Sequence, residues 1–248
     1  MGIKRKLKSF LLNIVPPFLI REIENSILKQ KSVNEQFINL SYSQEGEDLI
    51  LARYFEGKNN GFFVDVGAHH PIRFSNTYKF YQLGWRGINI DPLPGSMKTF
   101  NELRTNDINL EIAVLNSEKD ELDYYSFNEP ALNTFNKDLA FSIEKQGRYK
   151  LVESIKLESF KLSTILENHV KEGQIIDFLT IDVEGMDFEV LKSNNWGKYR
   201  PEYIVLESLN STIENDMKSE ISVFLKDRSY LPVSKTVNSL IYKLMSDN

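Results

Sequence analysis

Short apolar runs alternate with segments of helical periodicity from residue 42 to the C-terminus. Several of these runs end at a glycine or an acidic residue, which is typical of buried parallel strands that reach a functional sheet edge. Two further runs flank Asn238–Ser239 and favour a closing hairpin, which adds an antiparallel strand at or near the sheet edge. Because helix-length segments separate the other strands, the pattern predicts an α/β fold with a doubly wound, mostly parallel sheet. The predicted strands are residues 61–67, 87–91, 110–114, 178–183, 203–207, 230–237 and 240–244.

Residues 117–161 lack the pattern of a single crossover helix. Alternation around 122–127 and 152–157 predicts two strands with a polar stretch between them. We expect this segment to form an insertion over the carboxyl edge of the sheet, followed by a helix over 162–170. Its aromatic side chains, Tyr124, Tyr125 and Phe127, suit either stacking on a sugar face or an ordinary pair of strands.

Residues 1–40 are predicted to form a basic and apolar helical extension, which precedes a main domain over 41–248. Four basic residues occur before position 9 and no acidic residue occurs before Glu22. The apolar run is too short to span a bilayer, and no small-x-small cleavage site follows it. Two interpretations stay open. Residues 1–20 lie on an anionic membrane as an amphipathic helix, which predicts a cytoplasmic protein at the inner face of the membrane. Alternatively, the helix packs on the domain or on a second subunit, as in a homo-oligomer.

Composition excludes several classes of chemistry. The chain has no cysteine, which rules out disulfides, thiolate zinc sites, iron–sulfur clusters and a thiol nucleophile. It has three histidines, and two of them are adjacent in sequence, so a metal site with three histidine ligands is disfavoured. The 30 basic and 35 acidic residues give a net charge of −5, which provides no general attraction to nucleic acid, and no nucleic-acid partner is expected.

The spacing of Gly67 and Asp91 predicts an adenosine site. Gly67 ends the first strand, and Asp91 closes the second strand 24 residues later, where its carboxylate can accept hydrogen bonds from both ribose hydroxyls. Ala68, His69 and His70 follow Gly67, so the G-x-G-x-x-G fingerprint of a diphosphate site is missing. The pattern therefore favours S-adenosylmethionine, with its amino-acid end near Asp65 and Gly67. The alternative is a structural turn with a capping aspartate.

Six short stretches, which occur in order from about residue 42 to Glu207, form a recognisable set: Ser43–Leu49, Phe63–Ala68, Ser75–Thr77, Gly84–Trp85, Ile90–Pro92 and Ile181–Gly185. At these stretches the chain resembles the FkbM-type S-adenosylmethionine-dependent methyltransferases. The usual Glu-Pro of that family after the second strand is here Asp91–Pro92, and the sequence has His69–His70 where many relatives carry asparagine after the glycine.

This resemblance implies a Rossmann-like class I methyltransferase fold and O-methyl transfer to sugars. The expected acceptor is a saccharide or a nucleotide-sugar in capsule, lipopolysaccharide or other glycan biosynthesis. Related sugar O-methyltransferases use a divalent cation, here Mg²⁺ or Mn²⁺. The candidate cofactor-binding residues are Gln44, Asp65, Gly67, Ala68, Asn76, Asp91 and Pro92.

The acids after the fourth and fifth strands are candidates for the chemistry. A sugar hydroxyl is a poor nucleophile, so transfer needs a base or a metal ion that acidifies it. Asp182 or His69 would take the proton directly. Alternatively, Asp182, Glu184 and Glu207 would bind the metal through oxygen ligands. The competing structural interpretations place Glu184 in the first turn of a helix, with Asp187, and pair Glu207 with Arg200.

Two further functions stay open from the sequence. The basic N-terminus fits a methyltransferase that acts on a lipid or protein acceptor at a membrane. The loop after Gly67 also permits an adenosine-binding module without catalysis. A nicotinamide oxidoreductase is disfavoured, because the glycines of the dinucleotide fingerprint are missing.

Overall fold

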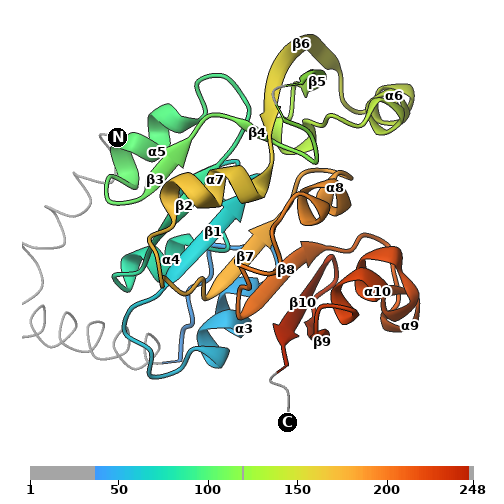
Figure 1. Cartoon of the computed structure of the whole chain (residues 1–248). Helices are drawn as coiled ribbons and strands as arrows, with labels where there is room; N and C mark the ends of the chain where they lie inside the picture. Colours follow the sequence, from blue (N-terminus) through green and yellow to red (C-terminus); the bar gives the residue numbers. More distant parts are fainter. Residues whose placement is uncertain (1–36, 119, 246–248) are drawn as a thin grey trace, which may run out of the picture. The chain divides into compact units, whose positions relative to one another are not determined.

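The computed structural model describes residues 37–118 and 120–245 (Figure 1). By its internal contacts the chain divides into residues 1–40 and 41–248, and the description below concerns the second unit. Residues 1–36 of the predicted helical extension, and with them the predicted membrane contact of residues 1–20, lie outside the described residues; residues 37–40 are described and are not helical. Among the described residues, no helix is both long and apolar enough to cross a bilayer.

A seven-stranded sheet forms the centre of residues 41–248, in the order β3-β2-β1-β7-β8-β10-β9. All neighbours are parallel except those of β10, which runs antiparallel to both β8 and β9. The doubly wound, mostly parallel sheet with a C-terminal antiparallel hairpin is thus confirmed. Its strands are β1 (Phe62–Val66), β2 (Arg86–Ile90), β3 (Ile108–Leu110), β7 (Phe178–Ile181), β8 (Tyr203–Glu207), β9 (Tyr230–Lys235) and β10 (Ser239–Leu244).

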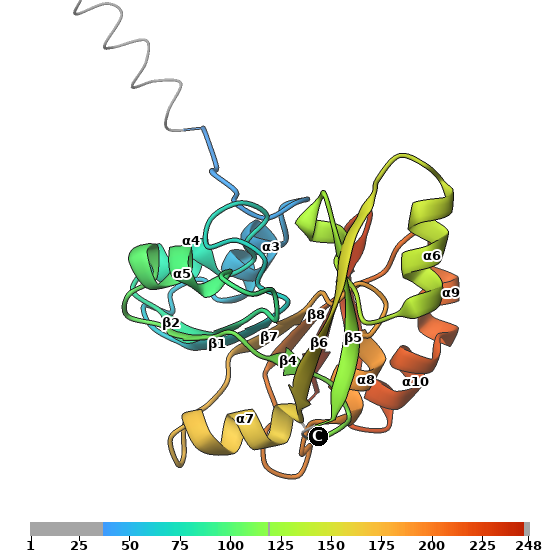
Figure 2. The ribbon, with the colours of Figure 1, turned by 90° about the horizontal axis from the view of Figure 1, so that it is seen from above.

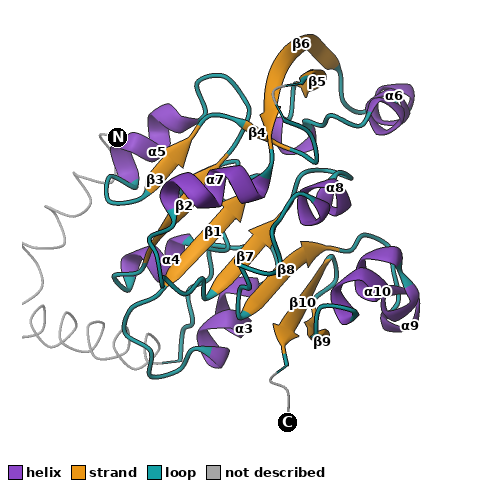
Figure 3. Cartoon of the chain, in the orientation of Figure 1, coloured by secondary structure: helices purple, strands orange, loops and turns teal. Residues whose placement is uncertain are grey.

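The central strands are buried on both faces, which explains their continuous apolar runs. In β1, Val64 and Val66 pack into one hydrophobic cluster, and Phe63 packs into another on the opposite face. Helices on the two faces cover these clusters (Figure 3). The α-helices of the described residues, on this sheet and elsewhere, are α3 (Glu47–Tyr54), α4 (Tyr78–Gln82), α5 (Met97–Leu103), α6 (Lys137–Lys145), α7 (Leu162–His169), α8 (Asp187–Lys192), α9 (Ile213–Lys218) and α10 (Glu220–Lys226). Helices α3 and α4 contribute to the Phe63 face, and α7, α8 and α10 to the other.

The predicted third strand over 110–114 is wrong as a single element. Residues Ile108–Leu110 form β3 and pair with β2. The chain then leaves this sheet, and β4 (Ala113–Val114) pairs with β6 (Leu151–Phe160) instead. Glu111, which is exposed, lies at the break between the two short strands. One apolar run of the sequence therefore contributes strands to two different sheets.

The segment between β4 and α7 forms a separate small sheet in the order β4-β6-β5, with β5 at Glu121–Phe127. Its two predicted strands are present and pair antiparallel, but the polar stretch between them also holds a 3-10 turn (Pro130–Leu132) and α6, which the sequence did not predict. Asn136 begins α6 by accepting a hydrogen bond from the Leu139 amide. Figure 1 shows this sheet beyond the arrowheads of β1 and β7, and Figure 2 shows it from above.

Candidate active site

All of the site residues expected from the sequence line one cavity of about 290 Å³ at the carboxyl ends of the parallel strands. This is the edge at which ligands bind in open α/β sheets. The parallel strands all end at this edge of the sheet. Gly67 and most of the acids lie at this edge because each directly follows a buried strand or ends one. The expected residues in the lining are Gln44, Asp65, Gly67, Ala68, His69, Asn76, Asp91, Pro92, Asp182, Glu184 and Glu207.

Position 67 requires a glycine because the backbone of Asp182 passes very close to it. Its φ of 84° lies in the left-handed region, and a Cβ at this position would stand 1.8 Å from the carbonyl oxygen of Asp182. Its amide and that of Ala68 both donate to the carbonyl of Ile90. The glycine therefore draws together the ends of β1, β2 and β7, which is a reason for glycine that the sequence alone did not indicate.

A buried network of hydrogen bonds, which the sequence did not predict, holds Asp65 in place. The Thr77 hydroxyl donates to Asp65 Oδ2 at 2.8 Å, and Arg104 donates in turn to the same hydroxyl at 3.2 Å. Arg104 is fully buried and forms an ion pair with Asp107. Burial, opposed by the Thr77 hydrogen bond and the Arg104 charge, raises the pKa of Asp65 to about 6.

Asp91 holds the loop after β1 in place. Its Oδ2 accepts from the His69 amide at 3.0 Å, and its Oδ1 accepts from the Leu93 amide at 2.9 Å. Burial raises the pKa of this carboxyl, and the two amides oppose the rise. Since a carboxylate offers about four acceptor positions, Asp91 keeps further positions for a ligand. The capping role and the predicted ribose contact are therefore compatible.

Gln44 reaches the cavity because both of its flanks are anchored. On one side, Ser43 donates to Asp48 at the start of α3. On the other, Glu45 accepts from both the amide and the side chain of Asn238, in the turn between β9 and β10. The C-terminal hairpin thus fixes a segment that lies almost two hundred residues earlier in the chain.

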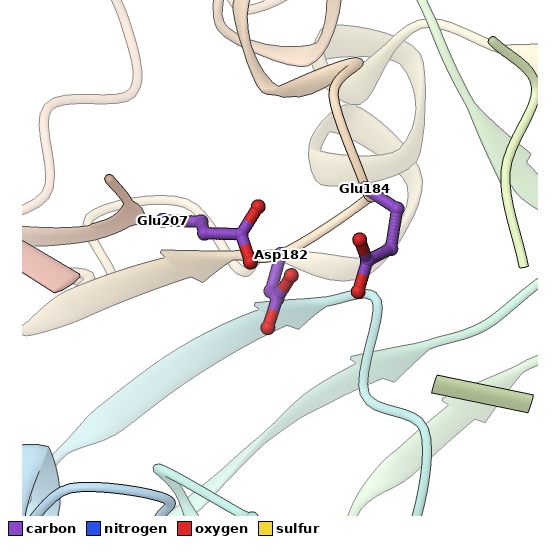
Figure 4. Close-up of side chains that lie close together, drawn as sticks. All are labelled: Asp182, Glu184 and Glu207. Carbon is purple, nitrogen blue, oxygen red and sulfur yellow. The ribbon is translucent and has the colours of Figure 1, made fainter. Parts of the chain in front are cut away.

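Asp182, Glu184 and Glu207 form a carboxylate cluster, with one oxygen of each within 4.8 Å of the others (Figure 4). Asp182 directly follows β7 and Glu207 ends β8. Glu184 lies in the following turn, where its φ of 49° is left-handed. The Thr134 hydroxyl donates to the Glu184 carbonyl at 2.7 Å, so the small sheet holds this turn in place.

The cluster is a set of like charges without a compensating cation among the described residues. Desolvation, followed by the charges of Glu207 and Glu184, raises the pKa of Asp182 well above its usual value, although its side chain is open to the cavity. Desolvation and neighbouring acids raise the pKa of Glu184 to about 7 and that of Glu207 to about 8. Such a cluster holds protons near neutral pH or binds a cation.

The two adjacent histidines differ in role. His69 lines the cavity, has a φ of 50° and carries a buried Nε2 without a hydrogen-bond partner. Burial, with the charges of Arg73 and His70, lowers its pKa, so the ring is neutral at pH 7. His70 Nδ1 accepts from the amides of Ile72 and Arg73, and this residue shapes the loop.

The structure also distinguishes between the alternative interpretations of Glu184 and Glu207, and it places Asn76. Helix α8 begins at Asp187, so Asp187 lies in its first turn and Glu184 does not. Arg200 donates to the carbonyl of Arg228, and no ion pair joins it to Glu207 among the described residues. Asn76 lines the cavity and donates to the Thr180 hydroxyl at 2.9 Å.

The small sheet supplies cavity residues that sequence reasoning did not assign. Tyr124 lines the cavity, whereas Tyr125 and Phe127 pack with α6 in the core of the small sheet. The aromatic alternation was the only signal for Tyr124. Asn133, Thr134 and Phe135 also line the cavity, and no pattern marked them.

The family comparison shows that this chain, with its Rossmann-like fold, is a methyltransferase. Residues 65–232 match the model of the methyltransferase FkbM domain, and the chain belongs to this family. Among solved structures, a putative RNA methyltransferase from Pyrococcus horikoshii superimposes with a TM-score of 0.40 at 11% identity, over 84% of this chain and 93% of that one. No curated protein matches the chain significantly.

Proposed function

We propose that this methyltransferase uses S-adenosylmethionine to methylate a hydroxyl of a saccharide in glycan biosynthesis. The observation that carries the proposal is the carboxylate cluster, which faces the cavity with raised pKa values and no compensating cation among the described residues. Oxygen ligands and bases of this kind suit the activation of a hydroxyl.

The cavity suits the donor by its charge and its polar atoms. S-adenosylmethionine supplies a methyl group on a positively charged sulfur. Five carboxylates line the cavity, and among the described residues neither lysine nor arginine does. Two buried polar atoms in the lining, His69 Nε2 and Asn133 Nδ2, have no hydrogen-bond partner in the part of the chain that the structure describes. An acidic lining with unpaired polar atoms is what a cationic, hydrogen-bonding ligand requires.

Asp182 is the residue to which we assign hydroxyl activation. As a base, it would take the hydroxyl proton, and its raised pKa brings it closer to neutral pH, where such a base works best. Desolvation, with the charges of Glu207 and Glu184, keeps that pKa high. With a metal, the same three residues would hold Mg²⁺ or Mn²⁺, which would acidify the hydroxyl instead. Either way, the protein's main task is to hold the oxygen in line with the methyl carbon.

The charge of the cavity favours an uncharged saccharide over a nucleotide-sugar. A nucleotide-sugar brings two phosphate charges toward five carboxyl groups, each ionised one of which repels it, and no basic side chain in the described lining offsets that repulsion. Like charges at short range in a partly buried site are strongly unfavourable. A nucleotide-sugar would therefore require a bound cation to bridge its phosphates, whereas a neutral sugar would not.

Transfer of a labelled methyl group from S-adenosylmethionine tests the proposal. Neutral oligosaccharides and nucleotide-sugars would be assayed with a chelator and with Mn²⁺. We expect label in a neutral sugar as a base-stable methyl ether. Loss of transfer in the chelator would assign the metal mode, and retention would assign the base mode. Label in nitrogen or carboxyl groups instead would contradict O-methylation of a saccharide.

A further inference from the structure

The wall of the cavity that the small sheet contributes is aromatic and neutral, unlike the strand ends. The rings of Tyr124 and Phe135 lie 4.8 Å apart at 45°, and both residues line the cavity. Asn133 lies between them in the chain order and also lines the cavity. Tyr124 is 4% exposed and Asn133 is 8% exposed, so both side chains are packed into the wall of the cavity rather than extended into solvent.

Asn133 has one satisfied and one unsatisfied polar atom. Its Oδ1 accepts from the Phe127 amide at 2.8 Å, which fixes the orientation of the side-chain amide. Its Nδ2 is buried and makes no close hydrogen bond among the described residues; its near neighbour is the Tyr124 hydroxyl, and a weak contact between the two side chains lowers the pKa of that hydroxyl. A buried donor without an acceptor is unfavourable, and at a cavity wall it points to a ligand acceptor.

This wall lies on the Asp91 side of the cavity. Burial is the main cause that raises the pKa of the Tyr124 hydroxyl, and the charge of Asp91 is the second. The charges that act on Asp182 come instead from Glu207, Glu184, Asp187 and Asp65. Apolar residues that follow β3, namely Ile112, Val114 and Leu115, also line the cavity.

We propose that the Tyr124–Phe135 pair and Asn133 form the adenine site of the donor, with Asn133 Nδ2 donating to a ring nitrogen of adenine. This inference rests on the proposed use of S-adenosylmethionine. Adenine offers a flat ring for apolar and aromatic contacts and ring nitrogens that accept hydrogen bonds, and these two features complement the rings and the unpaired amide donor of the wall. The position beside Asp91 sets the base next to the ribose that Asp91 is expected to bind. The insertion thereby selects the donor, in addition to any contact with the acceptor.

Calorimetric titration of S-adenosylhomocysteine into wild type, Asn133→Asp and Asn133→Ala tests this site. Asn133→Asp keeps the oxygen that accepts from Phe127 and removes the donor. We expect its affinity to fall by about tenfold, the effect of one lost hydrogen bond with an unpaired group. Asn128→Asp is the matched control, because Asn128 is exposed and its Oδ1 likewise accepts a backbone amide, that of Lys150.

Analogues of S-adenosylhomocysteine with C–H in place of N1, N3 or N7 separate a direct contact from an added charge. One of the three should bind wild type about tenfold more weakly than the parent compound. The Asn133→Ala variant should bind that analogue and the parent equally. Equal binding of all three analogues by wild type, or the same discrimination in Asn133→Ala, would overturn the adenine site. An absence of any binding by wild type would instead overturn the proposed donor.

Discussion

Asp91 and Asp182 occupy equivalent places in the fold but different chemical environments. Each directly follows a parallel strand, lines the same cavity and has a pKa raised by desolvation. Both carboxylate oxygens of Asp91 accept backbone amides. Asp182 has no such partner among the described residues, and acidic groups surround it instead.

The difference indicates a division of labour along one sheet edge. A carboxylate held by two amides is a fixed acceptor, suited to recognising hydroxyl groups without changing its own state. A carboxylate beside two others is unstable as a fully charged set, so it exchanges protons or takes up a cation. We therefore assign binding to the Asp91 side and chemistry to the Asp182 side.

The largest expected effect that separates the two sides is that of Asp182→Asn on turnover. Loss of a base or a metal ligand should lower the transfer rate by about 10²- to 10⁴-fold. Affinity for S-adenosylhomocysteine should stay within about twofold, because this substitution leaves Asp91 and its amides intact. Asp227→Asn, at an exposed helix end, is the control. Near-native turnover in Asp182→Asn would show that Asp182 has no part in the chemistry.

Asp91→Ala should produce the opposite pattern, with a smaller effect. Donor affinity should fall by about 10- to 100-fold, since a hydrogen bond to a charged group contributes about 1.5–3 kcal/mol. Turnover at saturating donor should stay near the wild-type value. Titration calorimetry and transfer assays on the same preparation measure both quantities. Unchanged donor affinity would reduce Asp91 to a loop cap.

Thr134→Val should disturb the Asp182 side indirectly. The Thr134 hydroxyl donates to the Glu184 carbonyl and accepts from the Asn136 amide, so valine removes both contacts. We expect turnover to fall by about fivefold, the equivalent of a hydrogen bond of about 1 kcal/mol. Thr134→Ser keeps the hydroxyl and should restore turnover. If serine and valine behave alike, the hydroxyl does not position Glu184.

The smallest expected effect is that of Glu207→Gln on stability, and it depends on pH. Desolvation, with the charges of Glu184 and Asp187, raises the pKa of Glu207 from 4.5 to about 8. The folded protein therefore holds a proton that the unfolded chain releases, so this group's contribution to the free energy of unfolding falls as pH rises between these values.

Glutamine does not ionise, so Glu207→Gln should gain stability relative to wild type as pH rises from 5 to 8.5. The full pKa rise would correspond to several kcal/mol, but Glu207 is partly exposed and titrates together with the two neighbouring acids, so we expect a relative gain in Tm of about 2–4 °C, the shift that ~1 kcal/mol causes in a chain of this size. Thermal denaturation in metal-free buffer measures it. The same difference in Tm at both pH values would contradict a raised pKa in the folded state.

The sequence was informative wherever a functional residue directly follows a strand. Gly67, Asp91 and Asp182 each come next to a buried apolar run, and parallel strands bring such positions to one edge. The pattern of strands and the carboxylates of the site could therefore be predicted together. The strand over 110–114 was misassigned because apolar periodicity does not say which sheet a residue joins.

The remaining features depend on contacts between distant segments. Thr77 and Arg104 support Asp65 from other loops, and Thr134 reaches Glu184 across fifty residues of sequence. Asn133 lies in a polar stretch, where an asparagine in a cavity wall has the same sequence signature as one in solvent. The left-handed conformation of Glu184 likewise follows from its tertiary contacts rather than from its residue type.

Calorimetric titration of S-adenosylhomocysteine into wild type, Asp91→Ala and Asp182→Asn, in one metal-free buffer, tests the division of labour most directly. The account predicts micromolar binding by wild type, similar binding by Asp182→Asn, and binding at least about tenfold weaker by Asp91→Ala. An absence of binding by wild type, or an equal loss in both variants, would contradict it.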